Sequence, residues 1–190
     1  MSRPRGSDRR DGIIRAAFDV LAERGYRGTS LAAVAERVGL TQQGLMHYFP
    51  TKENLLAAVL ETRDQWDLLN FTRSKDPSAI GATELAELVD YNATRPGIVR
   101  TYTVLSADSV TEDHPAREYF HDRYARVRQL VAQMLERYAD DLPAGLTPAQ
   151  IAPIAVAVLD GLQLQWLLDP DEVDMPQDFR NFLALLGIKT

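Results

Sequence analysis

The chain has 190 residues, 45% apolar and 25% charged, which is an ordinary composition for a globular protein. It contains no cysteine, which excludes disulfide bonds and thiolate metal sites and favours a reducing cytoplasm. We expect no membrane contact and no export. No apolar run approaches the roughly 18 to 20 residues that span a bilayer, and no signal peptide precedes the first helix.

The net charge of −6 is unevenly distributed along the chain. Residues 1–53 contain nine Lys and Arg against six Asp and Glu, a net of +3, whereas the remainder contains 12 against 21, a net of −9. A polyanion is attracted to the first part and repelled by the second. The distribution favours a nucleic-acid contact in the first quarter of the chain.

The first quarter has the apolar periodicity of short helices separated by glycine or proline. Gly25 and Gly39 are predicted stops. Pro50 ends a third helix, because a residue before proline is pushed away from helical geometry. Each of the next helices is preceded by a hydroxyl that can cap it: Thr29 or Ser30, Thr41, and Thr51. We therefore expect helices at residues 8–24, 30–38, 41–49 and 51–73.

Longer helices are predicted beyond residue 77. Proline and glycine separate them, and Thr147-Pro148-Ala149-Gln150 has the pattern of a capping box with proline at the first helical position. The expected ranges are 79–95, 98–108, 115–141, 148–168 and 175–186. With about nine helices and no period-two alternation, the sequence predicts an all-α fold.

Residues 30–49 have the pattern of a helix-turn-helix, with a tight turn at Gly39 between two short helices. Three apolar residues of the second helix are expected to face inward: Leu45, Met46 and Phe49. Its other side is expected to enter the major groove, where glutamine can hydrogen-bond adenine, and carries Gln42, Gln43 and His47. Gly44 removes side-chain bulk where the backbone approaches DNA.

Phosphate contacts are expected where helix N-termini offer free N–H groups and a positive dipole end. These are the starts of the second and fourth helices, with Lys52 adding a cation, and a basic arm at Arg3, Arg5, Arg9 and Arg10. The complete set of expected DNA contacts is Thr29, Ser30, Thr41, Gln42, Gln43, Gly44, His47, Tyr48, Thr51 and Lys52. Spacing and charge alone leave two alternatives open, a helical protein-binding adaptor and a helical enzyme.

Two stretches carry a family resemblance. Residues 25–35, Gly-Tyr-Arg-Gly-Thr-Ser-Leu-Ala-Ala-Val-Ala, resemble the start of the DNA-binding domain of TetR-family regulators, also called the TetR/AcrR family. Residues 38–56 continue the resemblance through that family's recognition helix, including His-Tyr-Phe at 47–49 and Lys-Glu-Asn-Leu at 52–55. The match covers residues 9–60. Gln43 and Met46 depart from the residues usual there, which bears on the operator sequence.

The resemblance implies a homodimeric transcriptional regulator. The sequence offers no catalytic constellation, which argues against an enzyme, and we expect no cofactor and no metal. The resemblance also implies a DNA-binding domain at residues 8–53 and an effector-binding and dimerisation domain at 54–190. The expected function is repression at a near-palindromic operator, relieved by a small, mostly apolar effector, and activation is the alternative that the sequence leaves open. Effector binding would shift the fourth helix, from Lys52 toward Trp66, and tilt the DNA-binding heads.

The last two helices are the expected dimer interface. The helix at 148–168 is apolar nearly all round, so it needs cover on more than one side, and residues 158–170 resemble the penultimate helix of TetR-like regulators. Together with the helix at 175–186 and their two-fold mates it would form a four-helix interface, and an intrachain core helix is the alternative.

Aromatic and polar residues of the long helices are the candidates for effector contacts. They are Trp66, Tyr102, Tyr119, Phe120, Tyr124, Asp160, Gln163 and Trp166. His114, Glu118, His121 and Asp122 have a spacing that can present metal ligands on one helix face, but a charged, solvent-facing first turn is the preferred interpretation. No catalytic residues are predicted.

Overall fold

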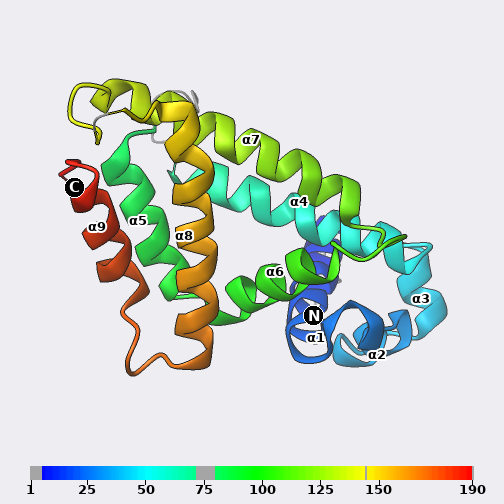
Figure 1. Ribbon diagram of the computed structural model, residues 1–190. Helices are drawn as coiled ribbons and strands as arrows, with labels where there is room; N and C mark the ends of the chain where they lie inside the picture. Colours follow the sequence, from blue (N-terminus) through cyan, green and yellow to red (C-terminus); the bar gives the residue numbers. More distant parts are fainter. Residues whose placement is uncertain (1–5, 72–79, 144, 190) are drawn as a thin grey trace. The chain divides into compact units, whose positions relative to one another are not determined.

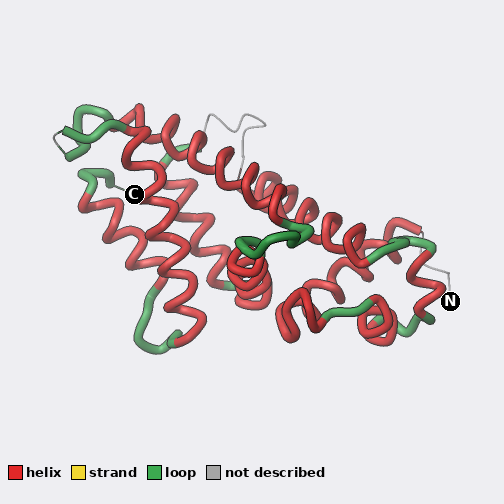
Figure 2. Tube along the Cα trace, turned by 45° about the vertical axis from the view of Figure 1, so that its right-hand side comes forward, coloured by secondary structure: helices red, strands yellow, loops and turns green. Residues whose placement is uncertain are grey.

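The computed structural model describes residues 6–71, 80–143 and 145–189 of the chain. Within these ranges the protein consists of nine α-helices and one short 3-10 helix joined by loops, with no strand (Figure 2). The all-α prediction is confirmed. The helices are α1 (Gly6–Gly28), α2 (Leu31–Arg37), α3 (Gln42–Met46), α4 (Lys52–Phe71), α5 (Ala82–Ala93), α6 (Pro96–Asp108), α7 (Arg117–Leu135), η2 (Glu136–Tyr138), α8 (Pro148–Leu168) and α9 (Met175–Leu185).

The helix ends differ from the prediction at a few positions. Gly25 adopts φ 64° and ψ −179°, which interrupts α1 as expected, but helical backbone resumes and continues to Gly28. Helix α5 begins at Ala82 because the carboxylate of Glu84 accepts a hydrogen bond from the Gly81 N–H at 2.9 Å. The Glu84 carboxylate thus caps the start of the helix.

The chain folds into two compact units, residues 1–66 with 100–117, and residues 67–99 with 118–190. Helices α4 and α6 each contribute residues to both units. The second half of α6 therefore packs as part of the N-terminal unit. These packing units do not test the predicted boundary after residue 53 between the DNA-binding and effector-binding domains, which stays a prediction.

In the first unit, α6 is hydrogen-bonded to both α1 and α4. The hydroxyl of Thr101, which is fully buried, donates to the carbonyl oxygen of Phe18 at 3.2 Å. The hydroxyl of Tyr102 donates to the carbonyl oxygen of Leu60 at 2.7 Å. Buried polar groups require such partners, so these two bonds fix where α6 lies against the other two helices.

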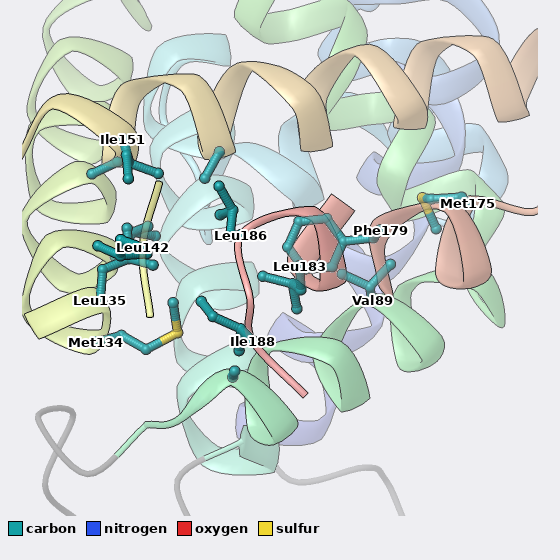
Figure 3. Packing of buried hydrophobic residues seen from close by; sticks show 14 residues of the cluster. Val89, Met134, Leu135, Leu142, Ile151, Met175, Phe179, Leu183, Leu186 and Ile188 are labelled. Carbon is teal, nitrogen blue, oxygen red and sulfur yellow. The ribbon is translucent and has the colours of Figure 1, made fainter. Parts of the chain in front are cut away.

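The core of the second unit is built from α5, α7, α8 and α9 around the apolar face of α9 (Figure 1). Phe179 and Leu183 of α9 lie next to Val89 of α5, and Leu135 and Ile151 are contributed by α7 and α8 (Figure 3). An ion pair between Arg180 and Asp90 joins α9 to α5. The predicted capping box of α8 is confirmed, since Thr147 and Gln150 exchange side-chain and backbone hydrogen bonds.

The expectation that no apolar run is long enough to span a bilayer was wrong for helix α8. Its 21 residues are, by length and composition alone, apolar enough to cross a membrane, whereas we expected no such run. The sequence estimate was wrong because Asp160 is the single charged residue in the helix. Only Ile151, Ala152 and Ala155 are buried, and Leu168 keeps 77% of its surface exposed. A core helix of a soluble protein passes the same test of length and composition.

Candidate nucleic-acid interface

Helices α2 and α3 form the predicted helix-turn-helix. The hydroxyl of Ser30 caps α2 by accepting from the Ala33 N–H at 3.1 Å. At the other end Gly39 adopts φ 65°, its N–H donates to Glu36 at 3.1 Å, and the Leu40 N–H donates to Ala35 at 2.9 Å. This pair of bonds is the Schellman motif, which needs a left-handed residue after the helix. The turn at Gly39 is therefore set by local chemistry.

Helix α3 is anchored on one side and open on the other. Leu45 is fully buried and Phe49 is 2% exposed, so both face inward as expected. The predicted outward residues are all exposed, namely Gln42, Gln43, His47 and Tyr48. The anchors hold the exposed face in one orientation, as base recognition requires.

Met46 was expected to face inward and does not. It is 42% exposed and lies on α3 three and four residues beyond Gln43 and Gln42, hence on the same face. The sequence prediction assumed that every apolar residue in the helix is core. The spacing to the two glutamines was the available signal that Met46 belongs to the outer face.

The cap of α3 explains two further residues. The hydroxyl of Thr41 accepts from the Gly44 N–H at 3.0 Å. A Cβ added at Gly44 would lie 3.2 Å from this hydroxyl oxygen, closer than most Cβ contacts. The small residue at position 44 therefore has an intramolecular reason, and the close approach of its backbone to DNA stays a prediction.

Thr29 is placed differently from the other expected contacts. Its side chain is 5% exposed and its hydroxyl donates to the carbonyl oxygen of Gly25 at 2.7 Å. Its backbone N–H donates to Tyr26 at 3.2 Å. Since both of its donors have partners inside the protein, Ser30 is the exposed hydroxyl at the start of α2.

The start of α4 packs on the ring of Tyr26. The hydroxyl of Thr51 accepts from the Asn54 N–H at 3.2 Å. The ammonium of Lys52 lies 3.9 Å from the centre of the Tyr26 ring, a cation–π contact. The Tyr26 hydroxyl donates to the carboxylate of Glu53 at 3.0 Å. The first turn of α4 is thereby tied to the end of α1.

The ionisation of this group follows from its surroundings. Burial raises the pKa of Tyr26 to about 12, and its bond to the Glu53 carboxylate adds to the shift. The pKa of Glu53 is lowered by its backbone N–H, by Thr51 and by Tyr26. Burial lowers the pKa of Lys52, an effect that Glu53 opposes.

Part of the predicted basic arm is described. Arg3 and Arg5 lie outside the described residues. Arg10 is exposed, and its guanidinium lies 5.1 Å from the centre of the Phe49 ring. Arg9 is half-buried in α1. The described part of the arm thus places Arg10 against Phe49, three residues beyond the end of α3.

Among the candidate effector residues, the structure brings Tyr124 and Asp160 together. The Tyr124 hydroxyl of α7 donates to the Asp160 carboxylate of α8 at 2.7 Å, and both are half-buried. Tyr119 and Phe120 are in edge contact with ring centres 5.2 Å apart. Gln163 and Trp166 follow on α8 and are half-buried.

The two remaining candidates lie elsewhere. Tyr102 belongs to the first unit, where it is 4% exposed and lies under the guanidinium of Arg63 at 3.7 Å. Trp66 lies in α4, but its side chain falls outside the described part of the structure. No group of three potential metal ligands occurs among the described residues. His121 pairs with its neighbour Asp122 on the surface.

Comparison with known proteins gives matches over most of the chain. Residues 13–59 match the family model described as bacterial regulatory proteins, tetR family, and residues 83–186 match that of the BetI-type transcriptional repressor, C-terminal. A relative, the HTH-type transcriptional regulator BetI of Burkholderia lata, is 30% identical over 173 residues, which cover 87% of this chain and 86% of the relative.

Solved structures show the same fold. The SmeT–triclosan complex is 20% identical with a TM-score of 0.72, covering 93% of this chain and 87% of that one. SmeT is the repressor of a multidrug efflux pump of Stenotrophomonas maltophilia. A transcriptional regulator from Saccharomonospora viridis in complex with choline is 19% identical with a TM-score of 0.72, covering 94% and 96%.

These matches decide between the alternatives left open by the sequence. TetR-family regulators are non-catalytic proteins that bind DNA operators and small effectors and typically dimerise, which removes the enzyme and adaptor alternatives. The chain belongs to the TetR family, and it is a ligand-responsive, DNA-binding transcriptional repressor.

Proposed function

We propose that the exposed face of α3 reads operator bases through Gln42, Gln43 and Met46. The observation that carries this assignment is the burial of Leu45 and Phe49, which fixes the opposite face outward. Glutamine amides can hydrogen-bond adenine in the major groove, and an apolar side chain suits the thymine methyl group. Thr41 and Gly44 support this face, with His47 and Tyr48 at its end.

Phosphate contacts flank α3 in this proposal. Ser30 at the start of α2, and Thr51 and Lys52 at the start of α4, combine hydroxyl or ammonium donors with helix N-terminal N–H groups. Such contacts position the protein and carry no sequence information. Their removal weakens binding to every duplex alike.

Gel shifts with three variants test these roles. Lys52→Ala is expected to weaken binding to all duplexes and to reduce the salt slope by about 0.9 for each phosphate that is no longer neutralised. Gln43→Ala is expected to change base preference at one position, by about 1–3 kcal/mol. Gln133→Ala, an exposed glutamine of α7, is the matched control and should do neither. Equally weakened binding to all duplexes by both test variants contradicts the assignment.

For the dimer, we propose the predicted pairing of α8 and α9 with their two-fold mates. Large apolar side chains stay exposed on both helices, including Ile154 and Leu164 of α8 and Leu185 of α9. A Cβ added at Gly161 meets no atom within 4 Å, so this part of α8 leaves room for a crossing helix. Two recognition helices about 34–36 Å apart then match the half-sites of a near-palindromic operator.

Sedimentation tests the dimer. The wild-type chain is expected to sediment as a dimer of the 21.3 kDa subunit at micromolar concentration. Leu164→Glu combined with Leu185→Glu should give a folded monomer, because each charge would be buried without a partner. Exposed Leu130 of α7, changed to Glu, is the control and should leave the dimer intact. A wild-type monomer removes the proposal.

The apolar surface of α8 is then covered by protein, and we place the repressor in the cytoplasm. Fractionation should recover it with other cytoplasmic proteins rather than in the membrane pellet. Recovery of the intact wild-type dimer from membranes contradicts this placement.

For the effector, we propose a small molecule with a mostly apolar body and one polar or cationic group, received by Asp160 and Tyr124. Aromatic rings contact apolar and quaternary ammonium groups well, and Tyr119, Phe120 and Trp166 lie in the same unit. Effector binding releases the operator by favouring a conformation in which the two heads no longer fit both half-sites.

Two compounds bound by structural neighbours, choline and triclosan, serve as probes. Titration calorimetry is expected to show binding of one of them, and that compound should release DNA in an anisotropy assay. If choline binds, Asp160→Asn should weaken it at least tenfold while Tyr124→Phe weakens it less, because only the first change removes the carboxylate charge. A response to choline unaltered by Asp160→Asn contradicts the role of Asp160.

A further inference from the structure

His114, in the connection between α6 and α7, lies against the same tyrosine as Lys52. The centres of the His114 and Tyr26 rings are 4.9 Å apart at an interplanar angle of 65°, an edge-on arrangement. The Tyr26 ring also contacts the Lys52 ammonium, and its hydroxyl binds Glu53. One ring therefore joins the α6–α7 connection to the first turn of α4.

The connection holds His114 in a defined place. The Arg117 guanidinium donates to the carbonyl oxygen of Val110 at 2.8 Å, and the Arg117 N–H donates to that of His114 at 2.9 Å. Ala116 is 1% exposed, which anchors the segment in the core. These contacts close the loop on itself, so His114 is presented from a fixed support.

The surroundings of the imidazole favour its neutral form. Its Nδ1 accepts from the Ala116 N–H at 3.2 Å, which leaves the proton of the neutral ring on Nε2, a buried atom without a hydrogen-bond partner. Burial lowers the pKa of His114, and Arg27 and Lys52 lower it further against the attraction of Asp108. A neutral ring packs on Tyr26 without repelling the Lys52 ammonium.

We propose that His114 is a positioning residue for operator binding, which holds Lys52 in place for its phosphate contact through the ring of Tyr26. This inference rests on the proposed phosphate role of Lys52. Removing the imidazole takes away one contact of the Tyr26 ring, so the ring and the Lys52 ammonium on it lose their fixed position. The consequence is weaker binding to all duplexes, since a phosphate contact carries no sequence preference.

The first readout is the position of Lys52 in the free protein. An ammonium over an aromatic ring shifts the ε-methylene protons of the lysine upfield in the NMR spectrum. We expect His114→Ala to move this signal toward the value of an exposed lysine and His114→Phe, which keeps an aromatic ring, to preserve it. An unchanged signal in His114→Ala overturns the proposal, whatever the role of Lys52 in DNA binding.

The second readout is affinity for a labelled duplex of random sequence, measured by anisotropy over a range of salt. His114→Ala is expected to weaken binding about three- to tenfold with a shallower salt slope, and His114→Phe to stay within about twofold of wild type. In a Lys52→Ala background, His114→Ala should have no further effect. A decrease of equal size in that background makes His114 merely structural and overturns the proposal.

The two readouts separate failure of this inference from failure of the phosphate assignment. If Lys52→Ala leaves affinity and salt slope unchanged, the phosphate role fails, and with it the proposed role of His114 in DNA binding. Thermal unfolding of each variant checks the fold, and His114→Phe keeps the test decisive if His114→Ala unfolds.

Discussion

Two adjacent residues of α3 allow a direct test of how this helix is oriented. Leu45 is fully buried and Met46 is 42% exposed, although both are large and apolar. Leu45→Ala removes a buried side chain and leaves a cavity, which costs about 2–5 kcal/mol. For a chain of this length each kcal/mol corresponds to about 2–4 °C, so the melting temperature should fall by roughly 4–20 °C. Met46→Ala should cost no more than about 0.5 kcal/mol.

For DNA binding we expect the opposite order: per folded molecule, Met46→Ala should change base preference more than Leu45→Ala does. Met46→Ala removes an apolar group from the face that carries Gln42 and Gln43, and should lower discrimination at one base pair. Calorimetric melting and gel shifts on the folded fraction measure the two effects separately. Comparable destabilisation by both substitutions, or an unaltered base preference for Met46→Ala, would refute the orientation described for α3.

Four further predictions concern stability. Gly187→Ala should destabilise by more than about 2 kcal/mol in denaturant titrations, because φ is 81° and the added Cβ would lie 2.7 Å from the Asp141 carbonyl oxygen. Gly39→Ala, with φ 65° and open space, should cost only about 1–2 kcal/mol. Thr101→Val removes the buried bond to Phe18 and should cost about 1 kcal/mol, measured in the same way. Because the pKa of His114 is lowered in the folded state, its contribution to stability is present above pH 6.5 and is lost as the pH falls below that value. The melting temperature of His114→Phe should therefore drop less than that of wild type between about pH 7.5 and pH 5.5.

The features that the sequence predicted well are those governed by local chemistry. The caps at Ser30, Thr41 and Thr147 and the turn at Gly39 involve residues no more than five positions apart. Each such arrangement is readable from the residue types alone, because the interacting groups are neighbours in the chain. The element order followed from these signals, and the family resemblance supplied the function.

Most of the features that it missed depend on how segments of the chain pack against one another. Thr29 and Ser30 are equally good capping residues by type. In the structure Thr29 is buried against α1, where its hydroxyl donates to Gly25. In the same way, Thr101 and Tyr102 sit in a helix far along the chain, yet they bond to Phe18 and Leu60. Nothing in the local pattern of α6 reveals those partners.

The contact between His114 and Tyr26 is another that local patterns do not predict, and the proposed positioning of Lys52 depends on it. Lys52 was a candidate DNA contact because of its place at a helix start, and Tyr26 was noted only as part of the family pattern. The spacing of His114 suggested a metal ligand or a solvated charge. In the folded chain His114 contacts Tyr26, although the two residues are 88 positions apart in the sequence. A substitution there should act on DNA binding without touching DNA, and local sequence rules would class it as neutral.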